Sequence, residues 1–398
     1  MLIHIIVNSL HARGKTAALH AKRCVEQRGR SIQSTHFTAA KGHACEIARH
    51  ISTTPTASTH LFIIVCGGDG TIHEVINGLA EGPNLLSFTL AIVPSGSANA
   101  LATTLRIESI DMAMRLISNA LSDTSSQHHS EPDFVLKPLR LASFAVAPPP
   151  ATRDVLLDDV AWPQRKCLFF CVISYGLHAQ IVKHSERWRF LGNRRFQYIA
   201  WINILLLWNY CARLWTLNAR SYIRNSATPQ HTNPRFQQHQ YNNTANSDND
   251  DSINKNNTRA IEYTGNRSFS YFLTTRMTHL EQGFHISPFS DPSTADLDVV
   301  STSTRSRIEV GKFLAGALGD AQHLDLDYVD NVKLSGFVLQ PVVERISWFF
   351  GRAASDVCVD GEMWTVRDGD AIWIREEEQE GVRFNVLAPA SPSLEEPQ

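Results

Sequence analysis

Short apolar runs alternate with segments of helical periodicity over the first third of the chain. Apolar residues fill Leu2–Val7, Leu61–Cys66 and Phe88–Val93, which is typical of strands buried on both faces. Strands that alternate with helices form layered α/β structures. The pattern therefore predicts an α/β domain with a mainly parallel sheet over residues 1–140.

A different pattern begins after the proline run at 148–150. Short β-rich stretches recur from there, which predict a mostly antiparallel β-sandwich domain over residues 141–387. These stretches are Cys167–Ser174, Ser268–Thr274, Val332–Leu339, Ala371–Ile374 and Val382–Leu387. Asn225–Thr258 is rich in Asn, Gln, Ser and Asp, so we expect a disordered insertion at 225–258. Residues 388–398 resemble a linker and are expected to form a flexible tail.

One stretch, Tyr198–Leu217, approaches the length and apolarity of a membrane span. Asn203, Asn209 and Arg213 interrupt it, and a charge inside a span is costly. We therefore expect no transmembrane segment, and instead a helix that is buried along one side or lies on a membrane surface.

Composition narrows the classes of partner. Of 398 residues 43% are hydrophobic, and Lys+Arg 37 against Asp+Glu 39 gives a net charge of -2, so nucleic acid is not expected as a partner. The seven cysteines form no CxxC pair, which favours reduced core thiols in a cytosolic protein over disulfides or a zinc site. The start, MLIHIIVNSL, indicates a first strand and not a signal peptide.

Candidate chemistry begins at the strand-to-helix turn CGGDGT. Backbone N–H groups at such a turn bind anions, because glycines let the ligand approach and the helix dipole adds positive charge. Gly67, Gly68 and Gly70 supply the turn, and we expect Thr71 to cap the following helix. Asp69 would repel an anion, so it either holds Mg²⁺, accepts the proton of an attacking hydroxyl, or caps a helix.

A second turn of the same design follows the next strand. VPSGSAN offers Ser95, Gly96, Ser97 and Asn99 between a strand and a helix. Since parallel strands of an open α/β sheet bind ligands at their carboxyl ends, both turns are expected to face one cleft. Together they predict a nucleotide site.

The loop after the first strand looks like a third phosphate-binding element. SLHARGKT (9–16) would match a Walker A loop if its first residue were glycine. Because that motif depends on its glycines, a P-loop NTPase is disfavoured. A basic loop that brings Asn8, Arg13 and Lys15 to the same cleft is still expected.

Four motifs in order resemble the catalytic domain shared by diacylglycerol, sphingosine and ceramide kinases. They are CGGDGTIHEVINGL (66–79), VPSGSANALA (93–102), SYGLHAQIVKHSERWRFLGNRRF (174–196) and VDGEMW (359–364). GGDGT alone is shared with NAD kinases and phosphofructokinases, whereas the set is specific. The resemblance implies an NAD kinase/diacylglycerol kinase-like fold for the first domain.

The resemblance also implies roles for single residues. Asp69 would deprotonate the lipid hydroxyl, and Mg²⁺ would lie at Asp69 and Asp360. Thr38 would lie near the adenosine, and two arginines would clamp the phosphates, as guanidinium groups suit phosphate oxygens. The implied ATP-binding set is Asn8, Arg13, Thr38, Gly67, Gly68, Gly70, Thr71, Ser97, Asn99, Arg189, Arg195, Asp360, Gly361 and Glu362.

Departures from the family pattern bear on the substrate. The first loop, NSLHARG, lacks the usual glycines, and Ala98 replaces a glycine of the second motif. Where sphingosine kinases carry carboxylates for an amine, this chain has Gln180, Val182 and His184. A cation without a buried carboxylate partner binds weakly. A neutral lipid, ceramide or diacylglycerol, is therefore favoured, with Gln180 and His184 at the lipid head group.

The resemblance also suggests a function for the apolar segment Tyr198–Leu217. Tyr198 and Trp201 follow Arg195 and could admit a lipid from a membrane surface, since Trp and Tyr suit that interface. A core helix is the alternative. The sequence thus predicts an ATP- and Mg²⁺-dependent lipid kinase, cytoplasmic and peripherally membrane-associated. A nucleotide- or membrane-binding scaffold without activity and a NAD kinase are the alternatives, and the oligomeric state is not predicted.

Overall fold

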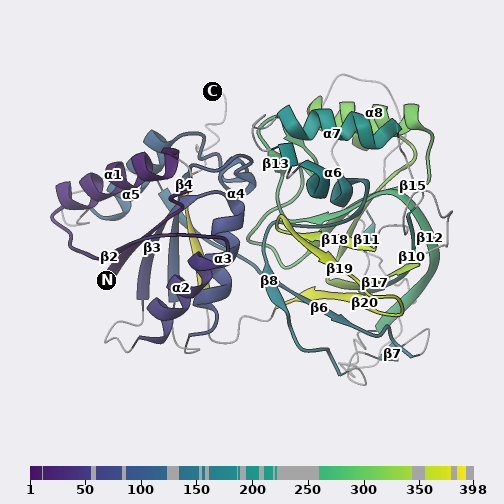
Figure 1. The fold of residues 1–398 in the computed structure, drawn as a ribbon, viewed down its shortest axis with the longest axis horizontal. Coiled ribbons are helices and arrows are strands. Elements are labelled where there is room, and N and C mark those ends of the chain that lie inside the picture. The colour runs from purple at the N-terminus through teal and green to yellow at the C-terminus, as the bar shows by residue number, and fades with distance from the viewer. Residues whose placement is uncertain are drawn as a thin grey trace, which may run out of the picture.

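A computed structural model gives the architecture of the chain (Figure 1). It describes residues 1–390 except 11, 55–59, 83–86, 123–133, 152–154, 157–160, 186, 189–193, 206–209, 218–219, 222–259, 343–354 and 378–382. The expected insertion at 225–258 and most of the expected tail lie outside the described residues.

The first body is built on a six-stranded sheet in the order β2-β1-β3-β4-β21-β5. All neighbours run parallel except β21 and β5, which run antiparallel. Its central strands are buried throughout because helices cover both faces. The strands are β1 (Leu2–Val7), β2 (Ile32–Phe37), β3 (His60–Gly67), β4 (Ser87–Pro94), β5 (Phe134–Pro138) and β21 (Arg383–Pro389).

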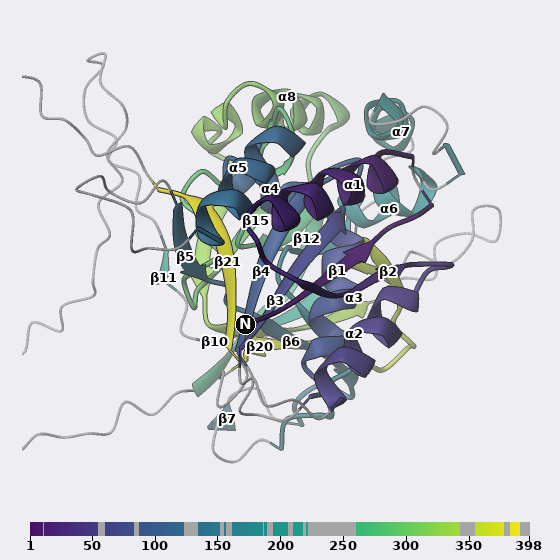
Figure 2. The same ribbon diagram turned by 90° about the vertical axis from the view of Figure 1, so that its left-hand side faces the viewer.

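Helices flank this sheet as the alternation of apolar runs predicts. In Figures 1 and 2, α1 and α5 lie on one face, and α2 and α3 lie on the other. Helix α5 starts where the hydroxyl of Ser109 accepts the N–H of Met112, and it buries Ala113, Leu116 and Ile117. The helices are α1 (Ala12–Gln27), α2 (His43–Thr53), α3 (Asp69–Leu79), α4 (Ala100–Thr104) and α5 (Ile110–Ala120).

The second body is a curved sheet, which has thirteen strands in the described part of the chain. Neighbouring strands in this sheet run antiparallel. Its main path is β11-β16-β15-β12-β10-β17-β20-β6-β8. The strands are β6 (Ala142–Ala147), β7 (Val155–Leu156), β8 (Cys167–Phe169), β9 (Val172–Gly176), β10 (Tyr210–Leu217), β11 (Arg220–Ser221), β12 (Ala260–Thr275), β15 (Leu297–Ser303), β16 (Val329–Leu334), β17 (Gly336–Val342), β18 (Asp356–Val359), β19 (Glu362–Thr365) and β20 (Ala371–Glu376).

Helices and a small hairpin complete the second body. Helices α6 (Leu177–Ser185), α7 (Arg194–Leu205) and α8 (Arg307–Leu318) lie together above its sheet in Figure 1, followed by the short helix η4 (Gln322–Asp325). The hairpin pairs β13 (His279–Glu281) with β14 (Phe284–His285), and β13 packs on α4 of the first body.

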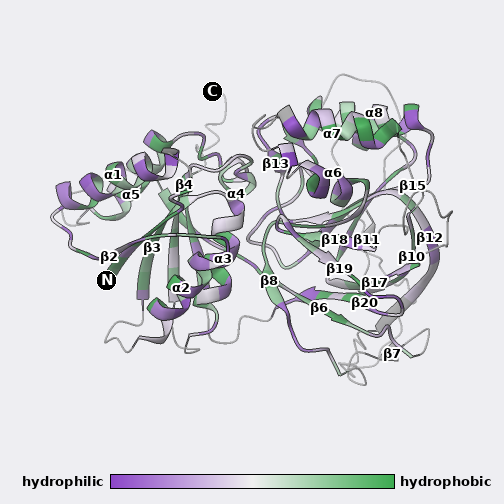
Figure 3. Ribbon diagram, viewed as in Figure 1, coloured by the Kyte–Doolittle hydropathy of each residue, from purple (hydrophilic) through white to green (hydrophobic). Residues whose placement is uncertain are grey.

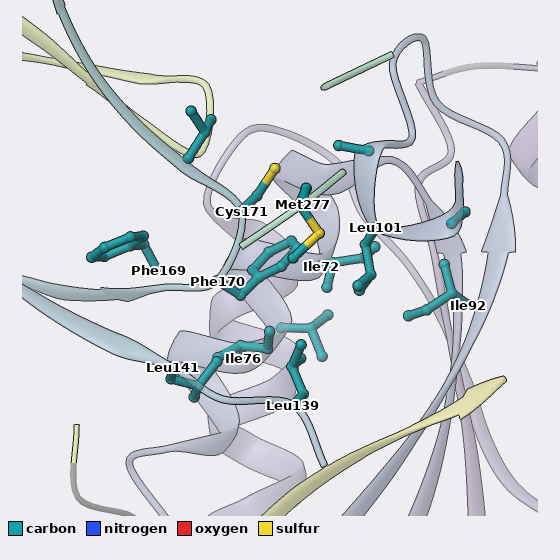
Figure 4. Packing of buried hydrophobic residues seen from close by; sticks show 14 of the residues in the cluster. Ile72, Ile76, Ile92, Leu101, Leu139, Leu141, Phe169, Phe170, Cys171 and Met277 are labelled. Carbon is teal, nitrogen blue, oxygen red and sulfur yellow. The ribbon is translucent and has the colours of Figure 1, made fainter. Parts of the chain in front are cut away.

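One hydrophobic cluster runs through both bodies. Figure 4 shows Ile72 and Ile76 of α3 and Leu101 of α4 facing Phe170 and Met277 of the second body. Figure 3 shows the same pattern along the chain, with hydrophobic colour concentrated in strands such as β3 and hydrophilic colour on exposed turns of α1. The two bodies therefore share an apolar core.

The predicted fold class, an α/β domain with a parallel sheet followed by an antiparallel β domain, is confirmed. Two predicted strands are each divided: Cys167–Ser174 covers β8 and β9, and Val332–Leu339 covers β16 and β17. The expected helix at Tyr198–Leu217 is wrong beyond Leu205, because Tyr210–Leu217 is strand β10, paired on both edges. No helix among the described residues is long and apolar enough to cross a membrane.

The last strand departs from the predicted order. Val382–Leu387 was expected in the second domain, but β21 lies in the first sheet between β4 and β5. Phe384 stacks on Phe88 of β4 with 5.2 Å between ring centroids. Ala388, the first residue of the expected tail, is buried in this strand. The domain boundaries at 140 and 387 stay a prediction.

Candidate active site

The two glycine turns meet at the carboxyl ends of β3 and β4. A Cβ atom on Gly96 would lie 2.4 Å from the Cα of Gly68, so the two backbones touch where side chains are missing. The N–H of Ser95 also donates to the carbonyl of Gly67 at 3.2 Å. The predicted convergence of the turns is therefore present.

The second turn is locked by Asn99. This residue adopts a left-handed conformation with φ 55°, and its side chain accepts the N–H of Gly96 and donates to the Gly96 carbonyl, both at 3.0 Å. Asparagine tolerates this conformation better than most residues. Ser97 lies exposed at the tip of the turn.

Asp69 joins the first turn to the second. Its carboxylate accepts the N–H of Ala100 at 2.8 Å and that of Leu101 at 3.1 Å, the first amides of α4. Burial raises the pKa of Asp69 to about 6, although these hydrogen bonds favour the ionised form. Among the three roles left open by the sequence, capping is thus present, but the helix that Asp69 caps is α4 and not α3.

The first loop reaches the same place through Asn8. Its amide donates to the hydroxyl of Thr71 at 3.0 Å. Thr71, expected to cap α3, is not its cap: α3 begins at Asp69, and the N-cap is Gly68 without a side-chain bond. Gly67 must be glycine, because a Cβ there would lie 2.6 Å from the Cβ of Thr71.

The remaining part of the first loop differs from a Walker A element. Arg13 is exposed in the first turn of α1. A Cβ on Gly14 would lie 2.1 Å from the carbonyl oxygen of Asn8, so this glycine serves close packing of the loop on α1. Thr38 is buried, and its N–H donates to Val7 at 2.9 Å. The hydroxyl of Ser9 donates to the carbonyl of Thr38.

Asp360 is a buried carboxylate with every acceptor position used. Oδ1 accepts the N–H groups of Cys171 (3.0 Å) and Val172 (2.7 Å), and Oδ2 accepts that of Phe170 (3.0 Å) and bonds His73 (3.0 Å). A carboxylate has about four such positions. The predicted metal role of Asp360 is not supported by this arrangement, which instead holds the β8–β9 junction.

His73 faces Asp360 from the middle of α3. Its Nδ1 lies 3.0 Å from Oδ2 of Asp360, and both side chains are buried. Burial disfavours the imidazolium, but hydrogen bonds with Asp360 and Cys167 outweigh it and raise the pKa of His73 to about 10. The result is a buried ion pair between the two bodies.

Gly361 and Glu362 complete the turn after Asp360. Asp360 and Gly361 both have positive φ, 46° and 87°, which tightens the connection from β18 to β19. The carboxylate of Glu362, with 29% of its side chain exposed, lies 3.4 Å from Nζ of Lys41 and 4.0 Å from Nε2 of His73. Glu362 therefore faces Lys41 and His73 of the first body.

The predicted arginine pair is only partly placed. Arg189 lies outside the described residues. Arg195 is buried in α7, with its guanidinium carbon 4.6 Å from the centroid of the Phe196 ring. Burial raises the pKa of Glu281 in β13 to about 7, and the nearby charge of Arg195 opposes that shift. Its role as a phosphate clamp stays a prediction.

The predicted lipid-binding residues lie on α6 and α7. Gln180 is buried, with its amide 3.5 Å from Asp356, and exposed His184 is 3.2 Å from Asn203 of α7. Tyr198 and Trp201 are 57% and 65% exposed. The core-helix alternative therefore does not fit these two side chains.

The sequence did not indicate which side chains connect the first body to the second. Asn77 donates to the carbonyl of Leu168 (2.9 Å) and accepts its N–H (2.7 Å), one turn of α3 beyond His73. Spacing offers a weak signal, since Asp69, His73 and Asn77 follow each other at intervals of four residues on one helix face. No comparable sequence pattern points to Lys41, which lies within the TAAKGHA stretch (38–44).

Comparisons with known proteins agree with this geometry. Residues 3–128 match the sequence profile of the diacylglycerol kinase catalytic domain. Human sphingosine kinase 2 is 26% identical over 238 residues, 58% of this chain and 32% of that protein. Sphingoid long chain base kinase 4 of Schizosaccharomyces pombe is 29% identical over 168 residues, 42% of this chain and 30% of that protein. The chain thus spans about a third of the length of these relatives.

A bacterial relative and two solved structures extend the comparison. Diacylglycerol kinase of Bacillus subtilis is 41% identical over 81 residues, 20% of this chain and 24% of that protein. The crystal structure of a diacylglycerol kinase from Bacillus anthracis str. Sterne superposes with a TM-score of 0.51 at 12% identity, covering 99% of this chain and 98% of that one. A second chain from that organism gives 0.57 at 14%, covering 99% and 96%.

At such low identity the solved structures establish the fold alone. The match of residues 3–128 includes both glycine turns and Asp69, whose contacts are described above. Residues 3–128 are thus similar to the diacylglycerol kinase catalytic domain, and this match is the family resemblance that the comparisons support.

Proposed function

We propose that the chain is a lipid kinase that transfers the γ-phosphoryl group of ATP to a lipid hydroxyl. Asp69 carries this proposal. It lies where the two glycine turns touch, near enough to Asp360 for that charge to help raise its pKa. Asp69 accepts the hydroxyl proton, the lipid oxygen bonds to the γ-phosphorus, and the bond to ADP breaks.

The fit of ATP rests on the shape of the glycine turns. Gly68 and Gly96 leave room only for backbone, while a Cβ on Gly70 would meet nothing within 4 Å. The open side of Gly70, at the first turn of α3, is where a phosphate can approach backbone N–H groups and the positive end of the helix dipole. Asn8 and Thr38 would border the rest of the nucleotide.

Mg²⁺ would accompany the triphosphate and neutralise the charge that develops on it. The carboxylate of Asp69 accepts the N–H groups of Ala100 and Leu101 in α4, and lone pairs remain on its oxygens. Asp360 has none left, and we propose that Glu362, with part of its carboxylate exposed, is the better second neighbour of the ion.

For the acceptor we propose a neutral lipid, ceramide or diacylglycerol. The side chain of Gln180 ends in an amide, which lies at hydrogen-bond distance from the carboxylate of Asp356. That carboxylate is already bonded to Lys183 and Thr365. Within the described part of the chain, an amine would therefore find no free carboxylate bonded to Gln180. The exposed Tyr198 and Trp201 of α7 would contact the membrane that supplies the lipid, which suits a peripheral protein of the cytoplasm.

A kinase assay tests this proposal directly. Purified protein is incubated with radiolabelled ATP, Mg²⁺ and detergent-dispersed ceramide, diacylglycerol or sphingosine, beside Asp69→Asn. We expect labelled ceramide or diacylglycerol from the wild type and at least a hundredfold less from the variant, the usual range for a lost general base being about 10²–10⁴.

Three other outcomes would change the proposal. Labelled sphingosine alone would overturn the neutral acceptor, and equal product from both proteins would remove Asp69 as the base. A parallel reaction supplies NAD in place of lipid, and if NAD becomes labelled while no lipid does, the chain is a NAD kinase. Nucleotide binding without any labelled product would favour the scaffold.

A further inference from the structure

A hydrogen-bonded bridge outside the glycine turns connects the two bodies through His73. This residue lies one helical turn beyond Asp69 on α3, and it is 4% exposed. Its Nδ1 is 3.0 Å from Oδ2 of Asp360, a residue 287 positions later in the chain. Asp360 in turn accepts N–H groups from the β8–β9 junction, so a displacement of His73 would be felt by the whole turn 360–362.

The other ring nitrogen faces the end of the same turn. Nε2 of His73 is 4.0 Å from Oε2 of Glu362, and the amide nitrogen of Asn77 stands 3.4 Å away. Both N–H groups of the Asn77 amide have acceptors, the carbonyls of His73 and Leu168. Asn77 therefore has no further N–H group for Nε2, which faces Glu362.

We propose that His73 is a positioning residue that orients the turn 360–362, and thereby fixes the carboxylate of Glu362 opposite the glycine turns. Lys41 supports Glu362 from the other side, at 3.4 Å. The hydrogen bond to Asp360 sets the start of the turn, and Nε2 of the same ring lies 4.0 Å from the carboxylate at its end. This inference rests on the proposed function, in which Glu362 borders the nucleotide and its metal ion.

The test compares variants that keep or remove the donor. His73→Leu has no donor, so we expect the affinity for ATP to fall about tenfold and kcat to fall with it, while KM for the lipid stays unchanged. His73→Gln can still donate to Asp360, and we expect it to keep ATP affinity within about threefold of the wild type. Ile76→Val is the matched control, since it perturbs the same helix in the apolar core without touching the turn.

Hydrogen exchange supplies a readout that does not depend on activity. The amides of Phe170, Cys171 and Val172, which donate to Asp360, should exchange at least tenfold faster in His73→Leu and at the wild-type rate in Ile76→Val and His73→Gln. If wild-type protein phosphorylates no lipid, the proposed function fails, but exchange and ATP affinity still decide the role of His73.

Unchanged exchange at these amides together with unchanged ATP affinity in His73→Leu would overturn the inference. A loss of ATP affinity equal to that of Ile76→Val would overturn it as well, because the effect would then come from helix packing. Should His73→Leu not fold, Asp360→Asn repeats the test from the other side, since an amide cannot accept from His73 and from all three backbone groups.

Discussion

At the scale of single residues, the site depends on the lack of side chains at its glycines as much as on the side chains that are present. Gly68 and Gly96 allow two turns to touch, and Asp69 uses the same proximity to hold the start of α4. A side chain at Gly96 would separate the turns, whereas one at Gly70 would extend into open space. The two glycines therefore have different functions, packing and ligand approach.

This difference predicts opposite effects on stability. Gly96→Ala should lower the free energy of unfolding by about 1–3 kcal/mol, because its Cβ overlaps Gly68. Gly70→Ala should not lower it, since alanine is the better helix former by up to about 1 kcal/mol. Both should weaken ATP binding, measured by titration calorimetry beside urea unfolding. A stable Gly96→Ala protein would mean that the turns do not touch.

His323 gives a second prediction, for stability against pH. Burial lowers its pKa to about 4, although the hydrogen bond to the carbonyl of Ile286 favours protonation. The unfolded chain, with a histidine pKa of about 6.5, therefore takes up the proton first as the pH falls. This contribution to stability is complete above pH 6.5 and is lost between pH 6.5 and 4, by up to roughly 3 kcal/mol.

Urea unfolding at several pH values checks this, with His323→Gln as the comparison. The amide of glutamine can still donate to Ile286 but does not titrate, so the variant should lose less stability over that interval. Identical pH dependence in both proteins would show that His323 titrates normally in the fold.

At the scale of elements, α7 combines a buried and an exposed face. Ile199, Asn203 and Ile204 are buried, while Tyr198, Trp201 and Leu205 are exposed. Helix α8, which contacts α7, adds exposed Ile308 and Leu318. Large exposed apolar side chains that gather on neighbouring helices are characteristic of surfaces that bind a membrane or a partner.

Replacing Tyr198 and Trp201 together by serine should weaken binding to liposomes at least tenfold, because the aromatic side chains bury most area at an interface. ATP affinity should stay unchanged. Leu136→Ser, at a 50% exposed leucine of β5, is the matched control and should bind liposomes like the wild type. Flotation assays measure the binding, and wild-type flotation of the double variant would contradict a membrane role for α7.

The elements also show what the sequence could and could not predict. Apolar runs identified β1, β3 and β4, because strands covered on both faces leave a continuous apolar signal. The segment Tyr198–Leu217 is uniformly apolar in composition, yet it forms a helix and then a strand. Its second half is a strand because it pairs with β12 and β17. Sheet membership of β21 likewise depends on distant partners.

The same limit applies to the site. Glycines around a single acid indicated the two turns, whose geometry is local. The bond between His73 and Asp360 spans 287 positions, and no short pattern signals it. The sequence therefore predicted that the two glycine turns meet, but not what attaches the late DGE turn to α3.

At the scale of the whole molecule, the two bodies are joined by an apolar cluster and by the last strand of the first sheet. The six tryptophans among the described residues all lie in the part of the chain that forms the second body, so their fluorescence reports on that body. Phe384→Ala removes a ring buried in the first sheet and should cost about 3–5 kcal/mol.

If both bodies unfold together, this substitution shifts the fluorescence transition in urea to lower concentration, in step with the loss of far-ultraviolet circular dichroism. Separate transitions, with the tryptophan signal at its wild-type midpoint, would mean that the shared core does not couple the bodies.

The position of β21 also has a consequence during synthesis. A ribosome adds residues 383–389 after strands β1 to β5 and after the strands of the second body, yet this segment lies between β4 and β5. Until it emerges, the nascent chain exposes an open edge of β4 and cannot complete the sheet that holds both glycine turns. The first sheet, although most of its strands precede the second body in the chain, can therefore be completed only after the strands of that body have been made.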